Sequence, residues 1–118
     1  MRSLLSLTAA LALFGCGGSS YSGVTAPPPV PPTPVMTTNV SLKNLAFSPG
    51  AIQVTPGATV QFTNNDGIAH NITFSSTSVM GATDFASGSR SVLMPTTPGS
   101  YAYHCTIHIG MNGTVVVQ

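Results

Sequence analysis

The sequence predicts an all-β fold, a β-sandwich of about seven to eight short strands over residues 37–118. Valine, isoleucine, threonine, tyrosine and phenylalanine gather in short runs here, and these residue types are enriched in β-strands. The pairs Pro49-Gly50, Pro56-Gly57 and Pro98-Gly99 separate several of the runs and are typical of turns. About eighty residues with this many strands are enough to close two sheets over one core.

A strand is expected wherever a β-forming run lies between two turn signals. In chain order, these runs are Thr38–Leu45, Ala51–Thr55, Thr59–Asn64, Asn71–Ser75, Arg90–Met94, Gly99–Cys105 and Gly113–Val117. The segment Gly81–Ser89 is polar and has no recognisable period, so no element is assigned to it.

The run Gly99–Cys105 also predicts side-chain directions, because successive side chains of a strand point to opposite faces. Tyr101, Tyr103 and Cys105 share one face, and His104 lies on the other. The two large aromatic side chains mark the first face as the core side. We therefore expect Cys105 to point toward the core and His104 to point away from it.

Residues 1–16 resemble a secretory signal peptide. Arg2 supplies a short positive region, and Leu4–Phe14 form an apolar region of suitable length. The segment ends in Leu13-Phe14-Gly15-Cys16, which resembles a bacterial lipobox, although Phe14 is bulkier than usual there. We expect residues 1–16 to be a lipoprotein signal peptide with Cys16 lipidated. The alternative is ordinary cleavage, with Cys16 lost or left free.

Residues 17–36 are expected to form a linker before the domain at 37–118. A Gly/Ser stretch is followed by Ala-Pro-Pro-Pro-Val-Pro-Pro-Thr-Pro, which favours extended polyproline II geometry. At about 3 Å per residue, such a linker could hold the domain roughly 50–60 Å from an anchor. We therefore expect an exported protein in the periplasm or on the cell surface, tethered to a bacterial membrane by lipid. The alternative is a leader with no specific reach.

The chain has only five charged side chains, and Arg2 belongs to the expected leader. In the domain, Lys43 and Arg90 cancel Asp66 and Asp84. A domain without a basic patch lacks the electrostatic footprint of a nucleic-acid-binding protein, so we exclude that class.

The two cysteines, Cys16 and Cys105, are expected to have different chemical roles. If Cys16 carries lipid, Cys105 is a lone thiol in an oxidising compartment, where a free thiol is a liability. A Cys16–Cys105 disulfide would tie a flexible leader to a distant part of the domain. A bound metal accounts better for Cys105.

The segment Cys105-Thr106-Ile107-His108-Ile109-Gly110-Met111 places a thiol, an imidazole and a thioether within one short loop. These donors suit copper, since thiolate and thioether favour Cu(I) and imidazole serves both oxidation states. The spacing alone is only moderately specific. Its position between an aromatic strand and a final Gly-Thr-Val-Val-Val strand strengthens it.

His70 is the best candidate for a further strong ligand. It follows the turn Asn64-Asn65-Asp66-Gly67 and precedes a predicted strand, so it lies at a strand end, as Cys105 does. Two histidines, a cysteine and a weak axial methionine form the site of electron-transfer copper proteins. Simpler readings remain for each residue: a core thiol for Cys105, a surface histidine for His70 and a core side chain for Met111.

With these residues in place, the chain resembles the plastocyanin/azurin/amicyanin group of cupredoxins over Leu45–Val117. Its ligand loop is most similar to those of amicyanin and pseudoazurin, although Ile107 and Ile109 stand where the family often has proline. The segments that carry the resemblance are Phe47-Ser48-Pro49, Ile52-Gln53-Val54, Pro56-Gly57, Val60-Gln61-Phe62, Asn64-Asn65, His70-Asn71 and Gly99–Cys105.

The resemblance implies a Greek-key sandwich with one copper ion at one end, in a type 1 site held by His70, Cys105, His108 and Met111. It also implies that Asn71 and Thr106 brace the ligand loops. The expected function is electron transfer between Cu(I) and Cu(II), without enzymatic activity. We expect a monomer that meets redox protein partners at the His108 end.

Other functions remain open at this point. A module for copper delivery or resistance would need more exposed, exchangeable ligands. An enzyme would need a copper site that opens when Met111 is not bound, and no pair of carboxylates or nucleophile–base arrangement supports one. A structural zinc site is also compatible with cysteine and histidine ligands.

Overall fold

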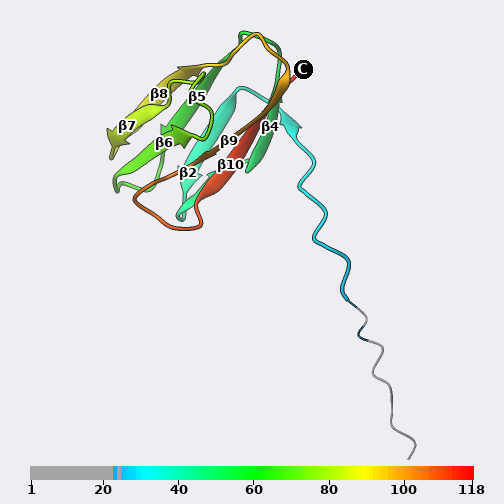
Figure 1. The fold of residues 1–118 in the computed structure, drawn as a ribbon. Helices are drawn as coiled ribbons and strands as arrows, with labels where there is room; N and C mark the ends of the chain where they lie inside the picture. The colour runs from blue at the N-terminus through cyan, green and yellow to red at the C-terminus, as the bar shows by residue number, and fades with distance from the viewer. Residues whose placement is uncertain (1–22, 24) are drawn as a thin grey trace, which may run out of the picture.

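The computed structural model describes residue 23 and residues 25–118, and it places ten β-strands in two mixed sheets that face each other (Figure 1). The expected all-β sandwich is confirmed. The expected signal peptide and Cys16 lie outside the described residues. The strands are β1 (Val35–Met36), β2 (Asn39–Lys43), β3 (Ala46–Ser48), β4 (Ala51–Val54), β5 (Thr59–Asn64), β6 (His70–Phe74), β7 (Ala82–Phe85), β8 (Gly88–Leu93), β9 (Gly99–His104) and β10 (Asn112–Val117).

The larger sheet carries the elements that matter most for the metal centre. Its six strands follow the order β1-β4-β10-β9-β6-β7, with β4 parallel to both β1 and β10 and the other pairs antiparallel. Thr73 of β6 pairs with His104 of β9. This register brings the first residue of β6 and the residue after β9 to the same end of the sheet.

The smaller sheet has the order β3-β2-β5-β8. A two-residue turn at Asn44 and Leu45 joins β2 to β3, and both residues have positive φ, at 54° and 57°. Positive φ at both central positions is the property of the tight hairpin turn that matches strand twist. The expected strand Thr38–Leu45 therefore ends at Lys43, and β3, which the sequence did not indicate, follows the turn.

The core between the sheets is centred on the ring of Tyr103. Its centroid lies 4.8 Å from that of Phe47, 5.3 Å from that of Phe62 and 5.2 Å from that of Phe74. The aliphatic side chains that alternate inward complete this core, and Leu42, Ile52, Val60 and Val115 among them are fully buried. Gly113 of β10 pairs with Tyr103 and makes room for its ring, because a Cβ there would lie 2.3 Å from Tyr103 Cζ.

The polar segment that received no element contains β7 and the start of β8. β7 lies at the edge of the larger sheet, where Thr83 and Asp84 are exposed and only Phe85 is buried. An edge strand of this kind shows no alternating pattern, which is why the sequence did not indicate it. The other expected strands agree with the structure within about two residues.

The N-terminal side of the sandwich begins at β1, which pairs with β4. Residues 25–33 are exposed, belong to no strand and run away from the sandwich (Figure 1). Within the described residues, no helix is long and apolar enough to cross a membrane.

Candidate metal centre

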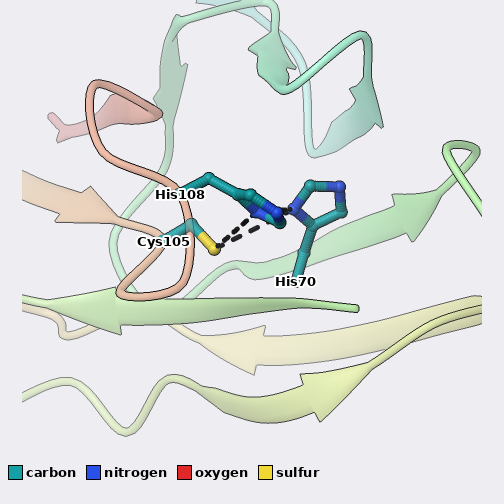
Figure 2. A group of neighbouring side chains, drawn as sticks. All are labelled: His70, Cys105 and His108. Carbon is teal, nitrogen blue, oxygen red and sulfur yellow. Dashed lines mark hydrogen bonds between the residues drawn. The ribbon is translucent and has the colours of Figure 1, made fainter. Parts of the chain in front are cut away.

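Three of the predicted ligands come together at one end of the sandwich (Figure 2). His70 is the first residue of β6, Cys105 directly follows β9, and His108 lies in the loop that joins β9 to β10. The side-chain donors converge because two neighbouring strands of the larger sheet deliver His70 and Cys105 to the same end. The loop then folds back and adds His108.

The three donor atoms form a compact triangle. His70 Nδ1 lies 3.1 Å from His108 Nδ1 and 3.9 Å from Cys105 Sγ, and His108 Nδ1 lies 3.7 Å from Cys105 Sγ. Metal sites bind imidazole nitrogen at about 2.0–2.1 Å and thiolate sulfur at about 2.3 Å, so ligands around one ion are about 3.3–3.9 Å apart. The observed separations lie within or just below this range, so the donors fit a single ion.

The three candidate ligands differ in how far their side chains are exposed to solvent. His70 and Cys105 are buried, at 0% and 3% exposure, whereas His108 is half-buried. An ion at their centre would lie just beneath the surface, with His108 as the ligand nearest to solvent. In β9, Tyr103 and Cys105 are buried and Tyr101 packs against the core, as expected, whereas His104 is half-buried and outside the core.

Met111 lies at the far end of the ligand loop, and its side chain is buried. The Cys105 N–H donates to the Met111 carbonyl at 3.0 Å, and the Met111 N–H donates to the His108 carbonyl at 3.3 Å. These backbone hydrogen bonds close the loop and hold Met111 beside Cys105 and His108. The fourth ligand position stays a prediction.

Asn71 braces the ligand loop from the adjacent strand. Its side-chain oxygen accepts from the Thr106 N–H at 2.9 Å, and its amide donates to the Thr106 hydroxyl at 2.7 Å. The same amide donates to Asp84 Oδ1 at 2.9 Å, and the Thr73 hydroxyl donates to Asn71 Oδ1 at 3.2 Å. The amide of this buried residue is fully hydrogen-bonded, which fixes the backbone next to Cys105.

Asp66 contacts the other ring nitrogen of His70, with 2.8 Å between Oδ2 and Nε2. Desolvation raises the pKa of Asp66, but hydrogen bonds from the Leu45 N–H, His70 and the Asn44 N–H, together with the electrostatic effect of the neighbouring imidazole, outweigh it and lower the pKa overall. The carboxylate is therefore ionised at neutral pH.

Sequence reasoning placed Asp66 only in a turn and did not connect Asp84 with the site. Asp66 lies four residues before His70, in the loop that leads to β6. Its other partners are the backbone amides of Asn44 and Leu45, which are far away in sequence. Asp84 lies on the edge strand that had no sequence pattern. The proximity of Asp66 to His70 along the chain was the one available signal.

The fold and the donor set together define a class of protein. A β-sandwich that holds two histidines and a buried cysteine in a triangle has the ligand arrangement of blue-copper proteins. The comparisons with known proteins agree with this class.

The family model described as copper binding proteins, plastocyanin/azurin family, matches residues 34–118. Plastocyanin of Ulva prolifera is 37% identical over 87 residues, which cover 64% of this chain and 89% of that protein. Amicyanin-alpha of Methylorubrum extorquens is 31% identical over 119 residues, which cover 97% of this chain and 98% of that protein.

Among solved structures, an oxidized mutant of amicyanin matches with a TM-score of 0.61 and 28% identity over 68% of this chain and 80% of that chain. The chain belongs to the copper-binding plastocyanin/azurin family, the cupredoxins. The metal of the centre is copper, which suits one thiolate and two imidazole donors.

Proposed function

We propose that this protein is a type 1 copper electron carrier that cycles between Cu(I) and Cu(II) in the cell envelope. The observation that carries the proposal is the donor triangle of His70, Cys105 and His108, held at ligand spacing by hydrogen-bonded loops. Copper in such a site supplies one-electron chemistry.

Met111 is proposed as the weak axial ligand. It is buried, and backbone hydrogen bonds connect it to the two ligand residues of the same loop. A long axial thioether is the usual companion of a trigonal His₂Cys site and tunes its potential. With four protein ligands, no position is left for a substrate, so we propose a carrier and not an enzyme.

The rigidity of the site supports electron transfer over copper delivery. His70 and Cys105 are buried, and Asn71 and Thr106 fasten the loop that carries Cys105 and His108. Outer hydrogen bonds of this kind orient ligands and hold their geometry. A delivery protein would need ligands that a partner can reach, and only His108 is partly exposed here.

The half-buried ring of His108 is the proposed point of electron exit. The loop around it exposes Ile107 and Ile109, and Ile68 is exposed on the loop that precedes His70. These apolar side chains define a surface without a charged residue of its own. We propose that redox partner proteins dock there on a monomeric carrier.

Location in the cell envelope rests on the sequence of the N-terminal segment. The signal-peptide pattern of residues 1–16, the lipobox-like Cys16 and the proline-rich linker favour an exported, lipid-anchored protein. The exposed path of residues 25–33 is consistent with such a tether.

The test is the visible spectrum of the purified protein after addition of one equivalent of Cu(II). We expect an intense charge-transfer band from the thiolate that disappears on reduction and returns on oxidation. The control is Cys105→Ser, which removes the thiolate and should abolish the band. Weak, colourless copper binding by the native protein would contradict the proposal and would favour a delivery module.

A further inference from the structure

Asp66 joins a metal ligand of the larger sheet to a turn of the smaller sheet. Its Oδ2 atom lies 2.8 Å from His70 Nε2 and accepts from the Leu45 N–H at 3.1 Å. Its Oδ1 atom accepts from the Asn44 N–H at 2.5 Å. The carboxylate therefore has three donors around it, and its side chain is only 11% exposed.

The position of this carboxylate is fixed by backbone geometry. Asn44 and Leu45 both adopt positive φ, and successive backbone N–H groups in such turns form a concave site for an anion. The Asp66 N–H donates to Asn64 Oδ1 at 2.9 Å, and the buried Asn64 amide donates to the carbonyls of Ile68 and Phe85. The loop before His70 is therefore held from both sides.

The contact also decides which nitrogen of His70 carries the proton. Each oxygen of the Asp66 carboxylate already accepts from a backbone N–H, so the remaining close contact is met when Nε2 of His70 is the N–H donor. The Nδ1 lone pair is then free, and Nδ1 is the atom that faces Cys105 Sγ and His108 Nδ1. A carboxylate on the remote nitrogen of a ligating histidine also raises its basicity.

The chain offers an internal comparison, because Asp66 and Asp84 are its only acidic residues. Asp84 is exposed and accepts a hydrogen bond from Asn71, and Asp84→Asn keeps a side-chain oxygen that can accept the same bond, so this variant removes the charge and leaves the brace in place. Asp66 contacts a ligand directly and is shielded from solvent. The effect of the ligand contact can therefore be separated from the general effect of a nearby negative charge.

We propose that Asp66 is a positioning residue for the metal centre, which fixes the tautomer and orientation of His70 and lowers the reduction potential of the copper. The proposal rests on the proposed function, since it concerns the same copper site. The potential falls because the negative charge, transmitted through the imidazole, stabilises Cu(II) more than Cu(I).

The experiment compares Asp66→Asn, Asp66→Glu and the control Asp84→Asn in the full chain. Asp66→Asn should shift the Cu(II)/Cu(I) equilibrium toward Cu(I) by about tenfold, or about 59 mV for one electron. It should also weaken Cu(II) binding by about tenfold or more. Asp84→Asn should shift the equilibrium by less than about threefold, and Asp66→Glu should recover part of the native value.

A second readout needs no copper. In the metal-free protein at about pH 8, nitrogen NMR should find the ring proton of native His70 on Nε2. That proton should exchange slowly with water in the native protein and faster in Asp66→Asn.

Equal shifts of the potential in Asp66→Asn and Asp84→Asn would overturn the proposal, as would a proton on Nδ1 in the native protein. If Asp66→Asn does not fold, Asp66→Glu and the native tautomer decide the question. A native protein that binds no copper but keeps the Nε2 proton would overturn the electron-carrier function and leave the positioning of His70 standing.

Discussion

Tyr103 carries a buried hydroxyl that has no hydrogen-bond partner among the described residues. Burial raises the pKa of this phenol, so it stays neutral. The ring fills the centre of the aromatic core, whereas the oxygen contributes only a desolvation cost. The residue therefore stabilises the fold through its ring and not through its hydroxyl.

Tyr103→Phe should keep or raise the free energy of unfolding, by up to about 1 kcal/mol, because it removes an unpaired buried polar group. The measurement is denaturant unfolding of the metal-free protein. The matched control is Tyr101→Phe, since the Tyr101 hydroxyl donates to the Thr97 carbonyl at 2.7 Å. That variant should lose about 0.5–1 kcal/mol. A larger loss in Tyr103→Phe than in the control would contradict this account.

At the scale of elements, β6 and the ligand loop depend on the amide of Asn71. This one side chain bonds to both the backbone and the side chain of Thr106, across the gap between the strand and the loop. Because Cys105 and Thr106 are adjacent, the brace holds the Cys105 side chain in place before any metal binds.

Asn71→Ala should lower the free energy of unfolding by about 1–3 kcal/mol, since it leaves the Thr106 N–H without its partner in a half-buried site. Chemical denaturation of the metal-free protein measures this loss. Asn65→Ala is a suitable control, because Asn65 makes an exposed bond to Ser41 and its loss should cost less than about 0.5 kcal/mol. An equal decrease in the free energy of unfolding in the two variants would show that Asn71 does not brace the ligand loop.

The elements that the sequence predicts well are those with a strong local pattern. β4, β5, β9 and β10 alternate between buried and exposed residues or follow Pro-Gly turns. His70 and Cys105 lie at strand ends, and His108 lies in the loop between β9 and β10. The sequence does not predict β7, because β7 is a polar edge strand without an alternating pattern. The contact of Asp66 with the site is not predicted either, because its partners in the turn are the backbone amides of Asn44 and Leu45, and a side-chain pattern does not reveal such partners.

At the scale of the whole molecule, charged side chains are few, and the end that carries His108 exposes apolar side chains. The described residues contain two cations, Lys43 and Arg90, which balance the two aspartates. Ile109 is fully exposed on the ligand loop, Ile107 precedes His108 on the same loop, and Ile68 lies on the loop before His70; the last two are more than two-fifths exposed. Contact through this surface would bring two His108 rings together without an electrostatic barrier.

Electron self-exchange between two copies of the protein tests this surface without a foreign partner. NMR line broadening of mixed Cu(I) and Cu(II) protein gives the rate. We expect it to change little between low and high salt, because no charge pair steers the encounter. Ile109→Lys should slow it by about tenfold at low salt, since two lysines then face each other, and added salt should recover part of the loss.

The control for that variant is Leu93→Lys. Leu93 is 67% exposed, but it lies on β8 in the smaller sheet, away from the ligand loop. The two variants add the same charge, so a difference between them reports where the molecules meet. Equal slowing by Leu93→Lys would show that net charge, and not the His108 end, controls the encounter. A strong salt dependence of the native rate would show that the few charged side chains steer docking after all.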